Sequence, residues 1–225
     1  MCGRYTLVIN ELGELESRFI FGGSVGNWNP RYNAAPTQMM PVIHDADDGH
    51  VLKMMKWGLI PFWSKDESIG SRLINARFET LTEKPAFKHA VKKRRCIIPA
   101  DGYYEWLKMD KAKVPMRIVK QDGGLFGLAG LWDAWQRPDG ERIETFTIIT
   151  VDAAPGISHI HNRMPLILPE DMEQEWLKSD LRDADVSDLL GALQPVKDLR
   201  AYPVSKLVNS PVNDGPECIV EVERD

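Results

Sequence analysis

A cysteine occupies the second position of the chain, directly after Met1. Removal of Met1 would give Cys2 a free α-amine two carbons away from its thiol. The unperturbed pKa is about 8 for an α-amine and about 8.5 for a thiol, so both groups are partly nucleophilic near neutral pH. Together they form a 1,2-aminothiol, which condenses with an aldehyde to an imine and then closes to a thiazolidine ring. The alternative is an unreactive cysteine that fills space in the core, which is the usual place of a lone cysteine.

Glu105 lies among aromatic residues, in the run Asp101-Gly102-Tyr103-Tyr104-Glu105-Trp106. A carboxyl group packed against apolar rings keeps its proton to a higher pH, which suits a general acid or base near pH 7. The alternative is a glutamate at a strand edge that faces water. Alternation along a strand leaves both interpretations open, because aromatic residues stand on both faces of such a strand.

Two histidines that are two residues apart, His159 and His161, precede Arg163. On a strand their side chains would share a face, where two imidazoles can bind a metal ion. A third metal ligand is not apparent, because the other histidines are scattered along the chain. A single histidine that transfers protons, beside an arginine that grips phosphate, explains the cluster with fewer assumptions. We therefore expect no metal ion and no other cofactor.

Two aromatic residues, Phe62 and Trp63, stand just before a polar loop, and the chain has 7 tryptophans in all. Core packing is the usual role of any one such ring. The polar loop instead indicates an exposed edge, on which the bases of single-stranded nucleic acid stack while basic side chains hold the phosphates. Arg77, in Asn75-Ala76-Arg77, is a candidate for such a basic side chain.

The charge of the whole chain does not indicate nucleic-acid binding, since the net charge is −5 and the pI is near 5.6. Residues 88–95 nevertheless form a basic block, Lys88-His89-Ala90-Val91-Lys92-Lys93-Arg94-Arg95. This block predicts either a local basic face on an acidic protein or the cationic C-terminal end of a solvated helix.

The chain has 3 cysteines and no C-x-x-C pair. An odd number without such a pair argues against a disulfide framework and a structural zinc site, and for a reducing compartment. No stretch approaches the roughly 18 apolar residues of a membrane span, and no secretory signal opens the chain. We expect a cytoplasmic protein that does not bind a membrane.

Short strand-like runs, separated by Gly and Pro, dominate the chain. The expected strands span residues 4–9, 41–44, 51–57, 96–99, 103–108, 116–119, 126–132, 144–151 and 166–168, with closing strands at 204–208 and 219–222. Asp139-Gly140 predicts one hairpin turn and Asp122-Gly123-Gly124 another.

Helical patterns are fewer. Asn10 has the residue type of an N-cap for a helix over residues 11–21. Pro85 suits the first turn of a second helix, Pro169 opens a third, and residues 186–193 predict a last short one.

The chain shows no internal repeat, no low-complexity linker and no break in composition. We therefore expect one domain over residues 1–225. Its predicted class is α+β, with a largely antiparallel, barrel-like β core and a few peripheral helices.

Taken in series, these motifs resemble the SRAP family, the SOS-response-associated peptidases that attach to abasic sites in single-stranded DNA. The motifs recur in the family's order across most of the chain, and the resemblance implies the SRAP fold. They are Met1-Cys2-Gly3-Arg4, Tyr32-Asn33-Ala34-Ala35-Pro36-Thr37, Trp57-Gly58-Leu59-Ile60-Pro61, Ile74-Asn75-Ala76-Arg77, the run from Arg95 to Trp106, and Ile160-His161-Asn162-Arg163-Met164-Pro165, with a weaker match at Pro203-Val204-Ser205 and Val208-Asn209.

The resemblance implies a role for each matching residue. Cys2 would be the nucleophile once Met1 is gone. Three further residues would complete the active site: Asn75, Glu105 and His161. Contacts to DNA would come from Arg4, Asn33, Phe62, Trp63, Arg77 and Arg163, with the two aromatic rings near unstacked bases. His159 has no counterpart in the family's motif.

The implied reaction begins with an abasic deoxyribose, whose open form exposes an aldehyde at C1′. The amine of Cys2 attacks this aldehyde, and the carbinolamine loses water with Glu105 as acid–base and His161 as a proton shuttle. The Cys2 thiolate then adds to the imine carbon and gives a thiazolidine crosslink between protein and DNA. Asn75 would orient the chain terminus, and phosphate contacts would supply affinity without sequence preference.

Two other functions stay open at this point. A cysteine nucleophile at the N-terminus with a nearby histidine also suits a peptidase or amidohydrolase, and lyase activity could accompany the crosslink. A non-catalytic single-stranded DNA-binding module with a buried Cys2 is the second alternative. As partners we expect single-stranded DNA with abasic sites and replication-fork proteins, and we expect a monomer that associates with the nucleoid when it binds DNA.

Overall fold

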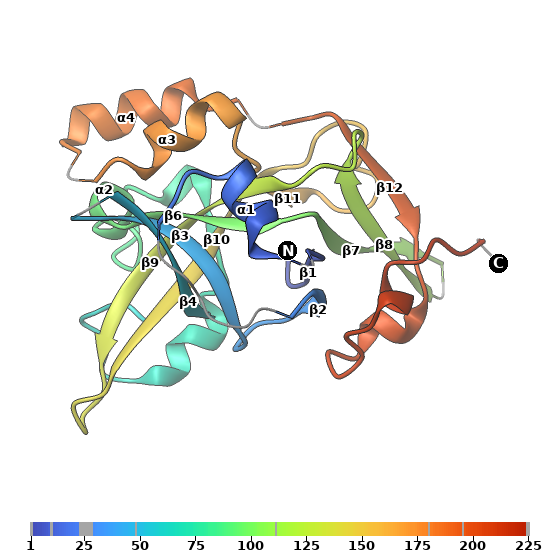
Figure 1. Ribbon diagram of the computed structural model, residues 1–225, viewed down its shortest axis with the longest axis horizontal. Coiled ribbons are helices and arrows are strands. Elements are labelled where there is room, and N and C mark those ends of the chain that lie inside the picture. The colour runs from blue at the N-terminus through green and yellow to red at the C-terminus, as the bar shows by residue number, and fades with distance from the viewer. Residues whose placement is uncertain are drawn as a thin grey trace.

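The computed structural model describes residues 2–9, 11–22, 29–47, 49–110, 112–179, 181–194 and 196–223. Two β-sheets make up most of it. In Figure 1 the larger sheet lies on the left and the smaller sheet extends from the centre, where β1 and β2 lie, to the right.

The larger sheet is a closed barrel with two short additions. Within the described ranges, five strands form a ring in the order β10-β4-β3-β6-β9, because β9 pairs back with β10. Neighbouring strands of the ring are antiparallel except β4 and β10, which are parallel. Two short strands, β5 and β11, pair with β10 beyond the ring. The bounds are Met39–Ala46 (β3), Gly49–Trp57 (β4), Asn75–Arg77 (β5), Arg95–Ala100 (β6), Phe126–Gln136 (β9), Arg142–Asp152 (β10) and Arg163–Pro165 (β11).

The smaller sheet has the strand order β12-β8-β7-β1-β2, and all its pairs are antiparallel. Its bounds are Tyr5–Leu7 (β1), Arg31–Ala34 (β2), Gly102–Met109 (β7), Ala112–Lys120 (β8) and Leu199–Pro203 (β12). β6 of the barrel leads into β7 through Asp101 alone. One continuous segment therefore passes from the barrel into the smaller sheet and carries Glu105 with it.

The helices are short and peripheral, and α3 and α4 cover one end of the barrel in Figure 1. The α-helices are α1 (Leu12–Arg18), α2 (Ala90–Lys93), α3 (Glu173–Leu177) and α4 (Asp183–Ala192). The 3-10 helices are η1 (Glu67–Arg72), η2 (Phe78–Thr80), η3 (Glu170–Met172), η4 (Lys206–Asn209) and η5 (Pro216–Cys218).

The two sheets share one hydrophobic core. Trp57 of the barrel packs edge-on against Tyr5 of the smaller sheet, with ring centroids 5.2 Å apart, and it stacks on Phe146 at 6.1 Å. A single cluster of buried apolar residues includes side chains from both sheets. Because these large rings have apolar partners on both sides, they fix the two sheets against each other.

Close packing inside the barrel requires a glycine at position 130. A Cβ atom there would lie 2.3 Å from Cδ1 of Ile98 and 2.8 Å from the carbonyl oxygen of Thr147. Gly130 thus lets β9 approach its neighbours β6 and β10 closely.

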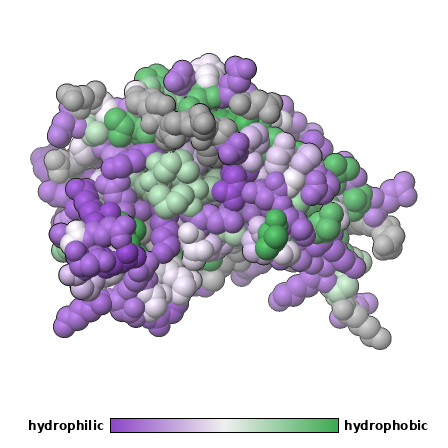
Figure 2. All heavy atoms as spheres, turned by 60° about the horizontal axis from the view of Figure 1, so that its bottom comes forward, coloured by the Kyte–Doolittle hydropathy of each residue, from purple (hydrophilic) through white to green (hydrophobic). Residues whose placement is uncertain are grey.

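One face of the molecule is mostly hydrophilic. Figure 2 shows this face, on which hydrophobic residues form small, separate clusters among polar ones. Among the residues that the structure describes, no helix is long and apolar enough to cross a membrane.

The predicted fold class is confirmed: the chain forms an α+β structure on a largely antiparallel barrel. The hairpin at Asp139-Gly140 is also confirmed, since it joins the paired strands β9 and β10. Most predicted strands and helices lie within or around observed elements. The single domain over residues 1–225 stays a prediction, and Asn10 lies outside the described residues.

Three expectations about elements were wrong. Asp122-Gly123-Gly124 forms a turn, but it joins β8 of one sheet to β9 of the other and makes no hairpin. Residues 166–168 are a buried segment with one isolated bridge, while the strand lies just before them, at β11. Residues 204–208 and 219–222 form 3-10 turns and a bridge, and the closing strand is β12.

Candidate active site

Cys2 lies where the two sheets meet. It precedes β1, and its side chain is fully buried, with 0% exposed. Asn75, at the start of β5, donates a hydrogen bond from Nδ2 to the carbonyl oxygen of Cys2 at 2.8 Å. Because β5 extends the barrel and β1 belongs to the smaller sheet, this hydrogen bond joins both sheets at the residue that the sequence singles out.

The thiol of Cys2 is held in its neutral form. Burial raises the pKa of the Cys2 thiol far above its usual value, and the negative charge of Glu105 raises it further. Sγ lies 3.9 Å from the carbonyl oxygen of Arg4. The thiol is therefore a weak nucleophile near neutral pH until a base removes its proton.

Glu105 lies on β7, the neighbour of β1, and only 4% of the residue is exposed. Burial raises the pKa of its carboxyl group, and the positive charge of His161 opposes this rise. Glu105 therefore does not face water, which matches the first of the two interpretations of its sequence context. Its raised pKa suits a group that donates and accepts protons near neutral pH.

His161 lies just before β11 and is half-buried. Its Nδ1 lies 3.0 Å from the backbone nitrogen of Arg163 and 3.1 Å from the carbonyl oxygen of the same residue, so the backbone of Arg163 orients the ring in either tautomer. The positive charge of His161 lowers the pKa of Glu105, which is consistent with a shared site. The histidine pair predicted for a strand face is absent, because His159 is an exposed residue of the preceding turn.

No metal centre is evident in the described part of the chain, where no group of three His, Cys, Asp or Glu side chains is close enough to hold an ion. All three cysteines are buried and free of disulfides. The thiol of Cys2, the carboxyl group of Glu105 and the imidazole of His161 are groups that can attack as nucleophiles or transfer protons.

Arg4 and Asn33 form a pair beside Cys2. Nη1 of Arg4 donates to Oδ1 of Asn33 at 2.8 Å. Arg4 is partly exposed, whereas Asn33 is 0% exposed and its amide nitrogen donates to three backbone carbonyls. The structure thus places Asn33 behind Arg4, and not at the surface where DNA contacts were expected.

Arg163 is also more enclosed than a surface DNA contact. Its guanidinium donates to the carboxylates of Glu79 and Asp152, both at 2.7 Å, and to the carbonyl of Thr150. A DNA phosphate would have to replace one of these carboxylates. Arg163 contributes its backbone to the orientation of His161, which the sequence pattern did not reveal.

The three remaining predicted DNA contacts are exposed. Phe62 is 50% exposed and Trp63 is 47% exposed. Arg77 is exposed on β5, two residues after Asn75. Their exposure leaves these three side chains accessible to nucleic acid.

Comparison with known proteins identifies the family. The family model for SOS response associated peptidase (SRAP) matches residues 1–211. The chain belongs to the SRAP family. It is 45% identical to the abasic site processing protein YoqW of Bacillus subtilis, over 97% of this chain and 99% of that protein.

Two further proteins are similar in sequence or in structure. The abasic site processing protein HMCES of Gallus gallus is 34% identical over 88% of this chain and 68% of its own length. A crystal structure of a protein from Bacteroides thetaiotaomicron has a TM-score of 0.86 and 29% identity, and covers 99% of this chain and 100% of that one.

In this SRAP structure, Asp133 anchors the exposed aromatic pair from behind. The backbone N–H of Phe62 donates to its carboxylate at 2.9 Å, and Arg94 pairs with the same carboxylate. The ring of Trp135 adds a hydrogen bond to the carbonyl of Ser64 at 2.7 Å. The backbone on both sides of Trp63 is therefore fixed, although the rings of the pair are exposed.

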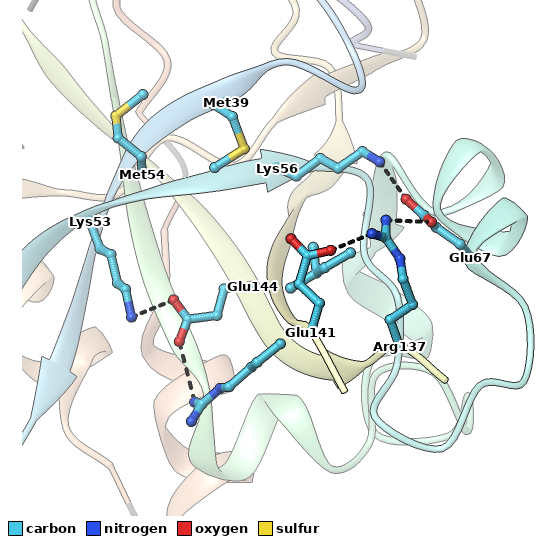
Figure 3. Close-up of a pocket in the computed structure, with 10 residues that line it drawn as sticks. Met39, Lys53, Met54, Lys56, Glu67, Arg137, Glu141 and Glu144 are labelled. Carbon is cyan, nitrogen blue, oxygen red and sulfur yellow. Dashed lines mark hydrogen bonds and ion pairs between the residues drawn. The ribbon is translucent and has the colours of Figure 1, made fainter. Parts of the chain in front are cut away.

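Ion pairs hold the segment that follows the aromatic pair (Figure 3). Glu67 of η1 accepts from Lys56 at 2.7 Å and from Arg137 at 3.1 Å, and Arg137 also pairs with Glu141. These residues line a surface hollow, together with Lys53, Glu144 and others, on strands β4 and β10. None of the four predicted catalytic residues lines this hollow. We therefore interpret its ion pairs as contacts that hold η1 in place.

Three cations of the basic block have partners within the protein. Lys92 pairs with Asp183, and Arg94 pairs with Asp133. Arg95 is buried and donates to the carbonyls of Val91, Lys92 and Trp176, so it caps the end of α2. These contacts favour the interpretation of the block as the cationic end of a short helix.

The structure adds residues that sequence reasoning missed. Trp106 follows Glu105, is partly exposed, and donates from Nε1 to Oδ1 of Asn209 at 2.7 Å. Asp214 accepts hydrogen bonds from the backbone of β2. The weak motif match at Val208-Asn209 was the only sequence signal that the C-terminal segment approaches the site.

Proposed function

We propose that this SRAP protein processes abasic sites in single-stranded DNA by forming a covalent crosslink through Cys2. The proposal rests on one observation above all: Cys2 lies at the junction of the sheets, with its carbonyl held by Asn75 and with Glu105 and His161 acting on the same site. The names of the relatives, abasic site processing proteins, support the same target.

The first step joins the Cys2 nitrogen to the sugar. Removal of Met1 turns this nitrogen from an amide into an amine. Its lone pair attacks C1′ of the ring-opened abasic deoxyribose, and a proton moves from nitrogen to oxygen to give a carbinolamine. Glu105 in its protonated form gives a proton to the hydroxyl group, which leaves as water while the N=C1′ bond forms.

The second step closes the ring. Glu105, now a carboxylate, takes the proton of the Cys2 thiol, and the thiolate attacks C1′ of the imine. The iminium nitrogen keeps its one proton and takes the electron pair of the C=N bond, and the product is a neutral thiazolidine. One water molecule is released overall, and Glu105 recovers its proton from the thiol. His161 serves the earlier opening of the sugar ring, in which the bond between C1′ and the ring oxygen breaks, the C1′ hydroxyl loses a proton and the ring oxygen gains one.

The buried thiol supports this order of events over peptide hydrolysis. A peptidase needs a thiolate for its first attack, but burial and the charge of Glu105 both keep the Cys2 thiol protonated. An α-amine has an ordinary pKa of about 8, so a part of it is already in its neutral, nucleophilic form near neutral pH. The imine forms first, and its positive charge then favours the thiolate beside it.

The lesion itself provides the specificity, because an intact nucleoside offers no aldehyde. Arg4 and Arg77 supply phosphate contacts in this proposal, and the aromatic pair Phe62 and Trp63 supplies a stacking surface for bases. Binding should therefore weaken as the salt concentration rises and should depend little on base sequence.

The test is a crosslinking assay with single-stranded DNA that carries one abasic site. We expect a protein–DNA species that survives denaturing electrophoresis, and an intact mass for the free protein that corresponds to loss of Met1. Cys2→Ala should form no stable product. Cys2→Ala and Cys2→Ser both keep the α-amine and lack the thiol, so each should give at most an imine that only a hydride reductant traps.

Other outcomes identify the rival functions. Stable crosslinking by Cys2→Ala would overturn the proposal. Strand cleavage without a stable adduct would indicate a lyase, and turnover of a peptide in the absence of DNA would indicate a peptidase. Retained DNA binding, with no covalent product from the parent protein, would indicate a binding module.

A further inference from the structure

The C-terminal segment holds the Arg4 guanidinium in one orientation. Nη1 of Arg4 donates to Asn33 Oδ1 at 2.8 Å and to the carbonyl oxygen of Val208 at 2.5 Å. Nη2 donates to the carbonyl oxygen of Asn209 at 3.2 Å. A guanidinium has five N–H donors, and these three contacts use three of them.

Two donors of the guanidinium have no acceptor among the described residues: Nε–H and one N–H of Nη2. Nε and Nη2 lie on one side of the group, and an arginine uses this side to bind two oxygens of one phosphate. We therefore take the Nε–Nη2 side of Arg4 as its free edge, while Nη1 is bound to protein.

Asn33 is the centre of this arrangement. It is fully buried, and its Nδ2 donates to the carbonyls of Val208, Ser210 and Asn213 at 3.2, 3.0 and 2.7 Å. Three acceptors fix the nitrogen side of the amide, so the oxygen side must face Arg4. The same amide thus joins the C-terminal segment to the cation.

Asp214 fixes the backbone that carries Asn33. Its Oδ1 accepts from the backbone N–H groups of Tyr32 and Asn33 at 2.6 and 2.7 Å, and its Oδ2 accepts from Nε of Arg31 at 2.6 Å. β2 is an edge strand of the smaller sheet, and its pairing with β1 is irregular between Arg31 and Ala34. Both consecutive N–H groups therefore find their acceptor in the carboxylate and not in a neighbouring strand.

We propose that Asp214 and Asn33 are positioning residues that aim the free edge of Arg4 at one DNA phosphate, which makes residues 208–214 part of the DNA-binding site. This inference rests on the proposed function, since it takes DNA as the ligand. It assigns no chemical step to Asp214, which acts only through Asn33 and Arg4.

Removal of the Asp214 charge should change DNA affinity in the direction opposite to the one that charge repulsion predicts. A negative charge near a DNA-binding surface normally weakens binding, so its removal should leave affinity equal or higher. If Asp214 positions Arg4, removal of its charge lowers affinity instead. Glu217 provides a matched control in the same segment, because it is exposed and makes no hydrogen bond with Arg4 or Asn33 among the described contacts.

The experiment compares Asp214→Asn with Glu217→Gln in binding to a fluorescent oligothymidylate without abasic sites, over a range of salt concentrations. We expect Asp214→Asn to weaken binding about 10-fold and to lower the slope of log affinity against log salt by up to about 1, as loss of one phosphate contact does. Glu217→Gln should bind as tightly as the parent protein or more tightly. In an Arg4→Gln background, Asp214→Asn should have no further effect.

Two results would overturn the inference: equal affinity of the two charge variants, or a loss in Asp214→Asn that persists in the Arg4→Gln background. If Asp214→Asn does not unfold cooperatively, Arg4→Lys carries the test. Lysine keeps the charge but lacks the fixed edge, so it should lose nearly as much affinity as Arg4→Gln, and parent-like binding would overturn the inference.

Failure of the proposed chemistry gives a different result. Binding to intact DNA requires no aldehyde, so a parent protein that binds but never crosslinks would overturn the crosslinking proposal and leave the role of Asp214 measurable. A parent protein that does not bind DNA at all would overturn both.

Discussion

Asn75 donates a hydrogen bond to the carbonyl oxygen of Cys2 at 2.8 Å, from the barrel to the segment that precedes the smaller sheet. The oxygen of the same amide, Oδ1, is buried and has no hydrogen-bond partner among the described residues. A buried acceptor without a donor is costly, so a site that tolerates one is ready to receive a donor. The amine of Cys2 or a sugar hydroxyl group is such a donor.

Asn75→Asp tests this relationship. The change replaces the donor with a second acceptor, which repels the Cys2 carbonyl and misplaces the amine. We expect the rate of crosslinking at saturating DNA to fall about 10-fold or more, since one lost hydrogen bond in a buried site costs about 1–3 kcal/mol. Affinity for intact single-stranded DNA should fall by less than the crosslinking rate, since the added charge weakens only phosphate binding. A parent-like rate in single-turnover experiments would show that Asn75 does not orient the terminus.

The pH dependence of crosslinking should be bell-shaped. The rate rises with pH while the Cys2 amine loses its proton, and it falls again when Glu105, whose pKa burial raises above the usual carboxyl range, can no longer donate one. In Glu105→Gln the alkaline fall should disappear and the maximal rate should drop. Rates measured across the pH range on both proteins decide this, and an alkaline fall that survives in Glu105→Gln would assign the acid to another group.

The fold class could be predicted because its main strands are unambiguous in sequence. Strands such as β3, β4 and β10 are apolar, β-branched or aromatic runs between turn residues, and their burial dominates the core. Four strands of three to five residues, β2, β5, β11 and β12, were not predicted at their observed positions. They have mixed polarity and exist because a neighbouring edge offers hydrogen bonds, which is a tertiary effect.

The turn at residues 122–124 shows a second limit of sequence. Its Asp and Gly residues suit a reversal of the chain whether the next strand pairs with the last one or leaves for another sheet.

The site shows a similar limit. The sequence indicated Cys2, Glu105 and His161 by type and motif, but burial of Asn33 and enclosure of Arg163 depend on contacts with distant segments. Asp214 lies about 180 residues from Asn33, so no local pattern could have indicated that contact.

Glu105 should also make stability depend on pH. Its folded-state pKa is raised by burial, so the protonated group is the one that the fold accepts. The contribution of Glu105 is therefore fully present below its unfolded pKa and is lost as pH rises through the folded pKa. We expect Glu105→Gln to melt at a higher temperature than the parent at alkaline pH, with the difference shrinking toward acidic pH. Thermal unfolding of both proteins at several pH values checks the sign, and a difference that grows toward acidic pH would contradict it.

Gly130 and Gly191 should respond to alanine with opposite signs. Gly130→Ala forces a Cβ against Ile98 and the backbone of Thr147, so it should destabilise the protein by about 1–3 kcal/mol. Gly191 lies in α4 with no atom within 4 Å of a new Cβ, so Gly191→Ala should stabilise by up to about 1 kcal/mol. Denaturant unfolding measures both, and equal effects would contradict the close approach of β9 to its neighbours.

The exposed aromatic pair should bind DNA by a force that differs from that of the arginines. Trp63→Ala removes a stacking surface worth about 1–3 kcal/mol per base, so affinity for single-stranded DNA should fall about 5-fold to 100-fold without a change in the salt slope. Arg77→Ala should instead lower that slope by about 1, because it removes a phosphate contact. Met109→Ala, at another exposed apolar residue on β7, is the control and should bind normally. Asp133 and the Glu67 ion pairs hold the surrounding backbone, so all three variants should keep the melting temperature of the parent. A loss of affinity in Met109→Ala equal to that in Trp63→Ala would contradict a role of the aromatic pair in DNA binding.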